Sequence, residues 1–115
     1  MGRIGAKLSE EATATCRQFE SQVSSIGDVT SRKMFGGFGI FHEGKMFALV
    51  TSAGRLYMKA TAANQKQFDD AASERYGRMP YWRVPERISA DRRNLLRWAR
   101  SSISVAHQSD KNRTG

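Results

Sequence analysis

The chain has 115 residues, a formal net charge of +8 and one cysteine, which fits a single soluble domain with one hydrophobic core. One cysteine excludes an intramolecular disulfide and favours a reducing compartment. No apolar run approaches the roughly 20 residues that cross a bilayer, and residues 1–11 hold no apolar segment suited to a signal peptide. The composition therefore predicts a cytoplasmic protein that does not contact a membrane.

The positive charge is concentrated in the last third of the sequence. Residues 75–115 contain ten Lys and Arg against three Asp and Glu, a net of +7, whereas residues 1–74 have a net of +1. A basic segment of this kind attracts anionic partners, above all nucleic acid. The alternative is a solvated helix face that keeps the protein soluble, because an excess of charge does not by itself define a site.

The first predicted element is an amphipathic helix near the N-terminus. Apolar residues recur at spacings of three and four over residues 8–23, and Cys16 is among them. Ser9 is the expected N-cap, and Gly27 is expected to end the segment. Because Cys16 belongs to the apolar stripe, we interpret it as a packed thiol and not as a nucleophile.

Residues 29–60 have the composition of strands. The pattern is clearest in three segments, Phe38–His42, Lys45–Thr51 and Arg55–Lys59. Glu43-Gly44 separates the first two segments and suits a two-residue hairpin turn, because glycine adopts a positive φ at little cost.

This hairpin places apolar side chains on both faces of the predicted sheet. With His42 opposite Lys45, the expected pairs are Phe41 with Met46, Ile40 with Phe47 and Phe38 with Leu49. A half-exposed antiparallel sheet usually alternates apolar with polar residues, so each face of this sheet needs a cover. The helices of one chain can cover one face. The other face needs the remaining elements or a second subunit, and we predict a homodimer.

The last part of the chain is predicted as two helices around a short extended segment. Residues 62–75 have the apolar spacing of a helix, which Gly77 stops. The segment Met79–Pro85 carries prolines near both ends, so it can form only a brief edge strand or an extended segment. Ser89 is the expected N-cap of a final amphipathic helix. We expect a single domain over residues 1–107 and a frayed polar tail over residues 108–115.

Five arginines and two aromatic residues are the candidate binding residues. The arginines form a candidate surface for a partner or for nucleic-acid phosphates: Arg83, Arg92, Arg93, Arg97 and Arg100. Tyr81 and Trp82 precede Arg83, and aromatic residues beside arginine can stack on single-stranded bases. Such residues also anchor a core or a subunit interface. We favour the core and interface role, because this segment must hold two helices to the sheet.

No motif in the sequence indicates catalysis, a cofactor or a metal ion. Gly36-Gly37-Phe38-Gly39 precedes a strand, whereas the phosphate-binding glycine motifs open a helix. We therefore interpret these glycines as a bulge or tight turn. His42 lies beside the hairpin turn and His107 next to the polar tail, and neither belongs to a chelate or an acid–base pair by its spacing. The sequence predicts no enzyme activity, no cofactor and no bound metal.

Five segments together resemble a known family: Arg32–Phe41, Gly44–Val50, Leu56–Ala60, Tyr81–Glu86 and Leu95–Arg100. The Met-Phe-Gly-Gly sequence of the first segment and the Lys-Met-Phe-Ala sequence of the second occur in order and close together. These blocks resemble the N-terminal domain of the TfoX/Sxy family of competence regulators. The similarity extends over residues 10–105, nearly the whole chain.

The resemblance implies a two-layer α+β fold, an antiparallel sheet with helices packed on it in the order α-β-β-β-α-β-α. This order agrees with the periodicity described above. Full-length members resemble transcriptional co-regulators that switch on DNA-uptake genes together with the cyclic-AMP receptor protein, and the family pattern supplies no catalytic residue. The sequence lacks their C-terminal domain, so we expect a stand-alone domain that acts through protein–protein contacts, with itself or with a transcription regulator. Direct nucleic-acid binding by the Arg-rich final helix is the alternative.

Overall fold

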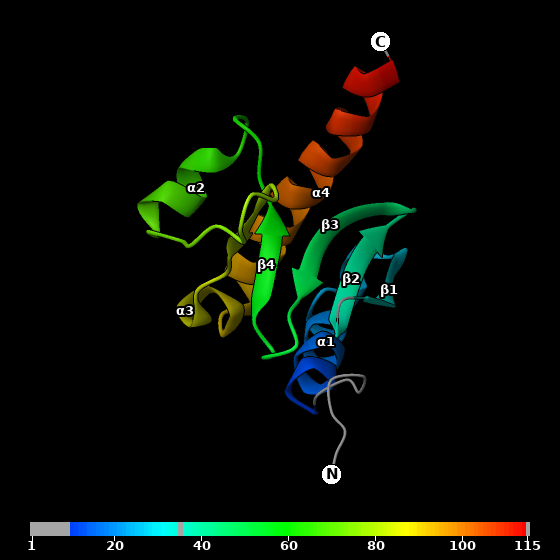
Figure 1. Cartoon of the computed structure of the whole chain (residues 1–115), viewed down its shortest axis with the longest axis vertical. Coiled ribbons are helices and arrows are strands. Elements are labelled where there is room, and N and C mark those ends of the chain that lie inside the picture. The colour runs from blue at the N-terminus through cyan, green and yellow to red at the C-terminus, as the bar shows by residue number, and fades with distance from the viewer. Residues whose placement is uncertain (1–9, 35, 115) are drawn as a thin grey trace.

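A five-stranded antiparallel sheet forms one layer of the domain, and helices form the other (Figure 1). This computed structural model describes residues 10–34 and 36–114, with side chains as far as residue 108. The strands, adjacent in this order, are β1 (Val29–Met34), β2 (Gly37–His42), β3 (Lys45–Val50), β4 (Leu56–Lys59) and β5 (Tyr81–Arg83). The helices are α1 (Glu10–Gln22), the 3-10 turn η1 (Ser24–Ile26), α2 (Gln65–Asp70), α3 (Glu86–Ser89) and α4 (Arg92–Thr114).

The predicted α+β class is confirmed, but the order of elements contains one more strand and one more helix than expected. β1 is the additional strand. It lies at the sheet edge and exposes Thr30, Arg32 and Lys33, so its sequence has little apolar signal. α3 has only four residues, too few to show a helical period. The helix predicted over residues 62–75 is confined to the six residues of α2.

The β2–β3 hairpin has the predicted turn but a different register beyond it. The pairs nearest the turn are as expected, His42 with Lys45 and Phe41 with Met46. The next pairs are shifted by one residue, Ile40 with Ala48 and Phe38 with Val50. The pairs predicted for Phe47 and Leu49 are therefore wrong. The alternation of side chains along a strand cannot predict a bulge, because a bulge inserts one unpaired residue into the strand.

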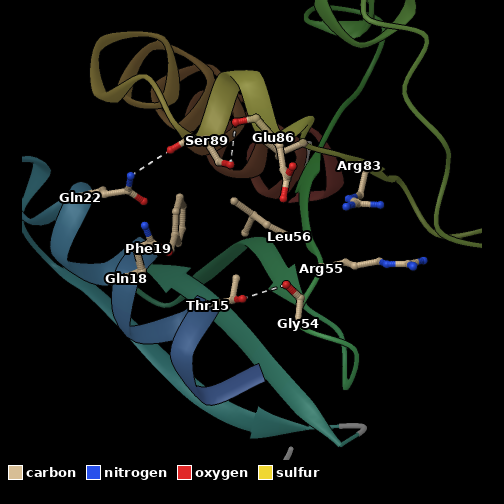
Figure 2. Close-up of a pocket in the computed structure, with 11 residues that line it drawn as sticks. Thr15, Gln18, Phe19, Gln22, Gly54, Arg55, Leu56, Arg83, Glu86 and Ser89 are labelled. Atoms are coloured by element: carbon tan, nitrogen blue, oxygen red, sulfur yellow. Dashed lines mark hydrogen bonds between the residues drawn. The ribbon is translucent and has the colours of Figure 1, made fainter. Parts of the chain in front are cut away.

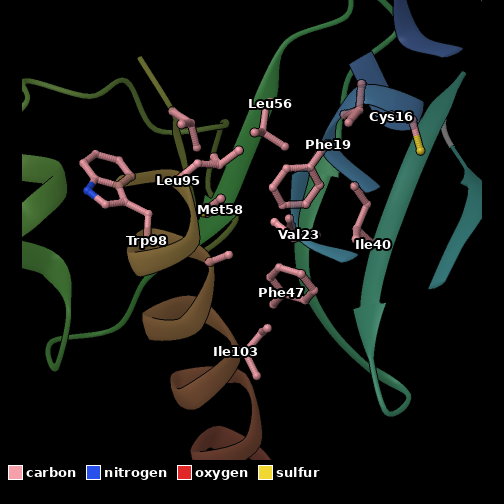
Figure 3. Packing of buried hydrophobic residues seen from close by; sticks show 14 of the residues in the cluster. Cys16, Phe19, Val23, Ile40, Phe47, Leu56, Met58, Leu95, Trp98 and Ile103 are labelled. Atoms are coloured by element: carbon pink, nitrogen blue, oxygen red, sulfur yellow. The ribbon is translucent and has the colours of Figure 1, made fainter. Parts of the chain in front are cut away.

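The hydrophobic core lies between the sheet and the two long helices. α1 contacts β1, β2 and β3, whereas α4 contacts β3 and β4. Large side chains from both layers are fully buried here, as Figure 3 shows for Phe19, Ile40, Phe47, Met58 and Leu95. Cys16 is 1% exposed and belongs to the same cluster, so its prediction as a packed thiol is confirmed. Burial raises the pKa of this thiol.

The glycines before β2 have structural roles, as the sequence suggested. Gly36 has φ +78°, a conformation that other residues rarely adopt. A Cβ on Gly37 would lie 1.9 Å from the carbonyl oxygen of Val50. The tight turn expected for this motif is therefore confirmed, and Gly37 also allows a close approach to the backbone of β3.

The final helix begins and ends at other residues than predicted. Asp91, and not Ser89, caps α4: its Oδ1 accepts hydrogen bonds from the backbone N–H of Arg93 at 3.1 Å and of Asn94 at 3.3 Å. The helical backbone continues to Thr114, through most of the segment expected to fray. Ser9, the expected cap of the first helix, lies outside the described residues. Over the described ranges, no helix combines the length and the apolar character needed to span a bilayer.

Candidate interaction surfaces

The sheet face turned away from α1 and α4, here called the open face, carries a small apolar cluster of its own. Leu49, Tyr57 and Tyr81 form its centre and are 5–7% exposed. Tyr76, from the segment after α2, packs on this cluster, with its ring centroid 5.0 Å from that of Tyr57. The chain thus covers the centre of the open face by itself, and the homodimer stays a prediction.

An apolar hollow of about 80 Å³ lies beside this cluster. We call it the methionine hollow, because Met34, Met46 and Met79 line it together with Leu49 and Tyr76. Met79 is 41% exposed. Among the described residues, it is the one large hydrophobic side chain that is exposed. Methionine side chains are flexible and polarizable, so they adapt to partners of different shape. The hollow therefore has the chemistry of a docking surface.

Cationic side chains accompany the methionine hollow. Arg32 precedes Met34 by two residues in β1, so both side chains lie on the open face. The guanidinium carbon of Arg32 is 4.6 Å from the centroid of the Phe41 ring. Arg75 donates hydrogen bonds to the carbonyls of Met79 at 2.9 Å and Arg78 at 3.1 Å. The guanidinium of Arg75 thereby fixes the loop that presents Met79. This guanidinium also lies 4.7 Å from the centroid of the Trp82 ring, so of these two cations Arg32 is the one on the same face as the hollow.

The two aromatic candidates lie on opposite sides of β5. Tyr81 belongs to the open-face cluster, and its hydroxyl donates a long hydrogen bond of 3.4 Å to the carbonyl of Met46. Burial raises the pKa of Tyr81 to about 12. Trp82 packs on the helix side, with ring centroids 6.3 Å from Phe68. Both residues are part of the packing of a single chain, and a role in a subunit interface stays a prediction.

Three of the five candidate arginines form one stripe on α4. A helix turns about 100° per residue, so Arg93, Arg97 and Arg100 lie within about 60° of one another around its axis. All three are exposed. Arg97 donates a hydrogen bond to Asn94, and none of the three forms an ion pair with a described carboxylate. We call these three residues the arginine stripe.

Arg92 and Arg83 do not belong to this stripe. Arg92 is exposed but points about 80–100° away from Arg93 and Arg100 around the helix. Arg83 lies in β5 and is partly buried. Its Nε is buried and has no hydrogen-bond partner among the described residues. The five candidate arginines are close together in the sequence, but the fold places them on different surfaces.

A polar cleft of about 150 Å³ separates α1 from α3 and the start of β4 (Figure 2). Thr15 Oγ1 donates to the carbonyl of Gly54 at 2.8 Å, and Gln22 Nε2 donates to the carbonyl of Ser89 at 2.9 Å. These two hydrogen bonds join α1 to the β3–β4 turn and to α3. None of the eleven residues that line the cleft is a histidine or a cysteine. We therefore interpret the cleft as a polar contact region between α1, α3 and the β3–β4 turn.

The fold also joins the two histidines of the chain. His42 ends β2 and His107 lies in α4, yet His42 Nδ1 and His107 Nε2 are 3.0 Å apart. The carboxylate of Glu43 is near both nitrogens. Spacing along the sequence could not show this group, because its histidines are 65 residues apart.

Comparisons with known proteins agree with this architecture. Residues 21–106, which run from the end of α1 into α4, match the TfoX N-terminal domain. The DNA transformation protein TfoX1 of Aliivibrio fischeri (strain ATCC 700601 / ES114) is 36% identical over 76 residues, which cover 65% of this chain and 36% of that protein. The match thus spans little more than a third of the length of this relative. These findings confirm the resemblance seen in the sequence, and the chain belongs to the TfoX N-terminal domain family.

Proposed function

We propose that this protein is a regulatory interaction domain that docks a protein partner on its open face. The observation that carries the proposal is the methionine hollow with the exposed side chain of Met79. The hollow has a volume of about 80 Å³ and an apolar lining, so an aliphatic side chain of a partner could dock there. Membership of the TfoX N-terminal domain family supports a regulatory role.

The charge around the hollow selects the chemistry of the partner. Arg32, Arg75 and Arg78 are all exposed cations near the residues that form it. A partner segment that presents an apolar side chain flanked by Asp or Glu would complement both the hollow and these cations. We propose an acidic surface of a transcription regulator, such as the cyclic-AMP receptor protein, as that partner.

A second copy of the chain is the other occupant, in the homodimer expected from the sequence. Its net charge of +8 works against this arrangement, because two copies of the same cationic surface repel each other. The oligomeric state therefore separates the two occupants. Sedimentation equilibrium of the purified chain at micromolar concentration is expected to give the mass of one chain if the partner is another protein.

The replacement Met79→Asp tests the docking surface. It removes the exposed apolar contact and adds a negative charge that repels an acidic partner. We expect its affinity for the cyclic-AMP receptor protein, measured by isothermal titration calorimetry, to fall about tenfold or more, equivalent to about 1.4 kcal/mol. Because Met79 is exposed, the free energy of unfolding should hardly change.

Ser104→Asp is the matched control, since Ser104 is exposed on α4 and the variant adds the same charge to the other layer. Its affinity should equal that of the wild-type chain. Equal affinities for both variants would contradict docking on the open face, and an absence of binding would rule out this partner. If the wild-type chain is a dimer that Met79→Asp dissociates, the occupant is a second copy.

The arginine stripe supports a second candidate function, direct nucleic-acid binding. These three exposed guanidinium groups, which form no ion pair with a carboxylate among the described residues, can neutralise three phosphates. In a titration with duplex DNA, the logarithm of the affinity should fall with the logarithm of salt concentration. Replacing Arg93, Arg97 and Arg100 by Ser should reduce that slope by about 2.7, since each phosphate contact contributes about 0.9.

A charge-matched triple variant controls for the loss of net charge. Arg17, Arg55 and Arg78 are also exposed but lie outside α4, so their replacement by Ser should change the salt dependence far less. If both triple variants weaken DNA binding equally, the attraction comes from overall charge and not from the stripe. A wild-type affinity that does not depend on salt would exclude this function.

A further inference from the structure

Two histidines from distant parts of the chain face each other beside the β2–β3 turn. His42 Nδ1 and His107 Nε2 are 3.0 Å apart, and the two rings meet edge to face with centroids 5.2 Å apart and planes at 80°. Both side chains are partly buried, so they are held by the fold yet remain open to solvent on one side. Two imidazole nitrogens at this distance can share a proton, or both can bind the same cation.

Glu43 supplies a third ligand atom to this pair. Its carboxylate and the two imidazole nitrogens all lie within 4.8 Å of one another. In a tetrahedral zinc site, two nitrogens bound at about 2.05 Å are about 3.3 Å apart. The histidines therefore need to separate by only a few tenths of an ångström, and rotation of the exposed Glu43 side chain can bring its oxygen to the ion.

The types of ligand atom select the class of ion. Imidazole nitrogen together with carboxylate oxygen suits Zn²⁺ and its neighbours Co²⁺, Ni²⁺ and Cu²⁺, whereas Ca²⁺ and Mg²⁺ prefer sites built from oxygen alone. Two histidines and one glutamate leave the fourth tetrahedral position to water. The group is thus complete as a three-ligand site for a zinc-class ion.

We propose that His42, Glu43 and His107 bind one Zn²⁺ ion and thereby join the β2–β3 hairpin to α4. The site is independent of the methionine hollow and of the arginine stripe. The bound ion links segments 65 residues apart, so it should stabilise the folded state by the ordinary linkage between binding and folding. Chelation should reverse that gain.

Titration of the untagged chain with Co²⁺, followed by displacement with Zn²⁺, tests the proposal. The chain contains only two histidines, so a histidine tag would hide the site and must be absent. We expect a visible Co²⁺ spectrum that saturates at one ion per chain and disappears on addition of Zn²⁺. One ion per two chains would overturn the proposal, because it would place the ion between molecules.

Two ligand variants separate loss of the site from loss of the fold. His107→Gln should weaken Zn²⁺ binding at least tenfold. Loss of a residue that only hydrogen-bonds a metal ligand already lowers metal affinity by about tenfold or more, and His107 would be a ligand itself. Glu43→Asn removes the carboxylate, and it suits the turn better than the wild-type residue, since Glu43 has φ +48° and asparagine accepts this conformation more easily. This variant should remain at least as stable without metal, yet bind Zn²⁺ more weakly.

Glu86→Gln is the matched control, because it removes an exposed carboxylate from α3 and should leave Zn²⁺ affinity unchanged. The ring resonances of the two histidines give a second measurement that needs no variant. Addition of Zn²⁺ to the wild-type chain should shift the signals of both rings together. Unshifted ring signals, or unchanged affinity in His107→Gln, would overturn the proposal.

Discussion

Replacement of Gly37 by alanine is expected to destabilise the domain by about 3 kcal/mol or more, at the upper end of what overpacking costs. The added Cβ would lie 1.9 Å from the carbonyl oxygen of Val50 and 3.0 Å from the carbonyl carbons of Val50 and Thr51. These are backbone atoms, so no side-chain rotation can relieve the clash, and β2 must separate from β3. Urea denaturation, with linear extrapolation of the free energy of unfolding, measures the effect.

Gly77→Ala is the control for this prediction. Gly77 has φ +56°, but a Cβ there would meet no atom within 4 Å. Its replacement therefore costs only the strain of a left-handed conformation, about 1–2 kcal/mol. If Gly37→Ala were no more destabilising than Gly77→Ala, the close approach of β2 and β3 would be wrong. Because Gly37 belongs to the Met-Phe-Gly-Gly block, its large cost would also show that this family signature preserves the fold.

Truncation of Phe68 is expected to cost about 3–5 kcal/mol, the usual range for a buried phenylalanine replaced by alanine. Phe68 is fully buried. Its ring centroid lies 4.8 Å from that of Trp98 and 6.3 Å from that of Trp82, so it joins α2 to both α4 and β5. The chain has two tryptophans, and both contact this ring. Intrinsic fluorescence in native buffer should therefore shift to the red, as water approaches the exposed indoles.

Phe68→Leu tests whether the effect comes from lost volume. Leucine keeps most of the buried apolar side chain, so this variant should lose much less stability than Phe68→Ala. Similar losses would indicate that the aromatic contacts with Trp82 and Trp98 matter more than the volume. Unchanged stability and fluorescence in Phe68→Ala would show that α2 is not anchored as described.

The two candidate functional surfaces can be tested independently because they lie on opposite layers of the domain. The methionine hollow is on the open face of the sheet, whereas the arginine stripe lies on the exposed side of α4. Phe68 variants do not separate the two surfaces, because the Phe68 ring contacts Trp98 in α4 as well as Trp82 in β5. Met79→Asp and the triple replacement of the arginine stripe each change one surface. A loss of partner docking without a loss of DNA binding would therefore assign the regulatory contact to the sheet.

The sequence alone determined those features of the protein that depend on residues close together along the chain. The Glu43-Gly44 turn, the burial of Cys16 and the exposed side of α4 follow from hairpin propensity and helical period, which act over two to four residues. The family signature also lies in local blocks. The five candidate arginines were grouped by their closeness along the chain, and only Arg93, Arg97 and Arg100 share one face of α4.

Only the tertiary structure decided what depends on contacts between distant segments. The bulge at Phe47 lies where β3 pairs with β2 and Phe47 packs in the core. β1 pairs with β2 along all six of its residues, although three of them are exposed. The meeting of His42 with His107 requires the complete sheet and α4. Partial cover of the open face comes from Tyr76 after α2. Periodicity carries no information about such long-range contacts, since they form only when the whole chain packs.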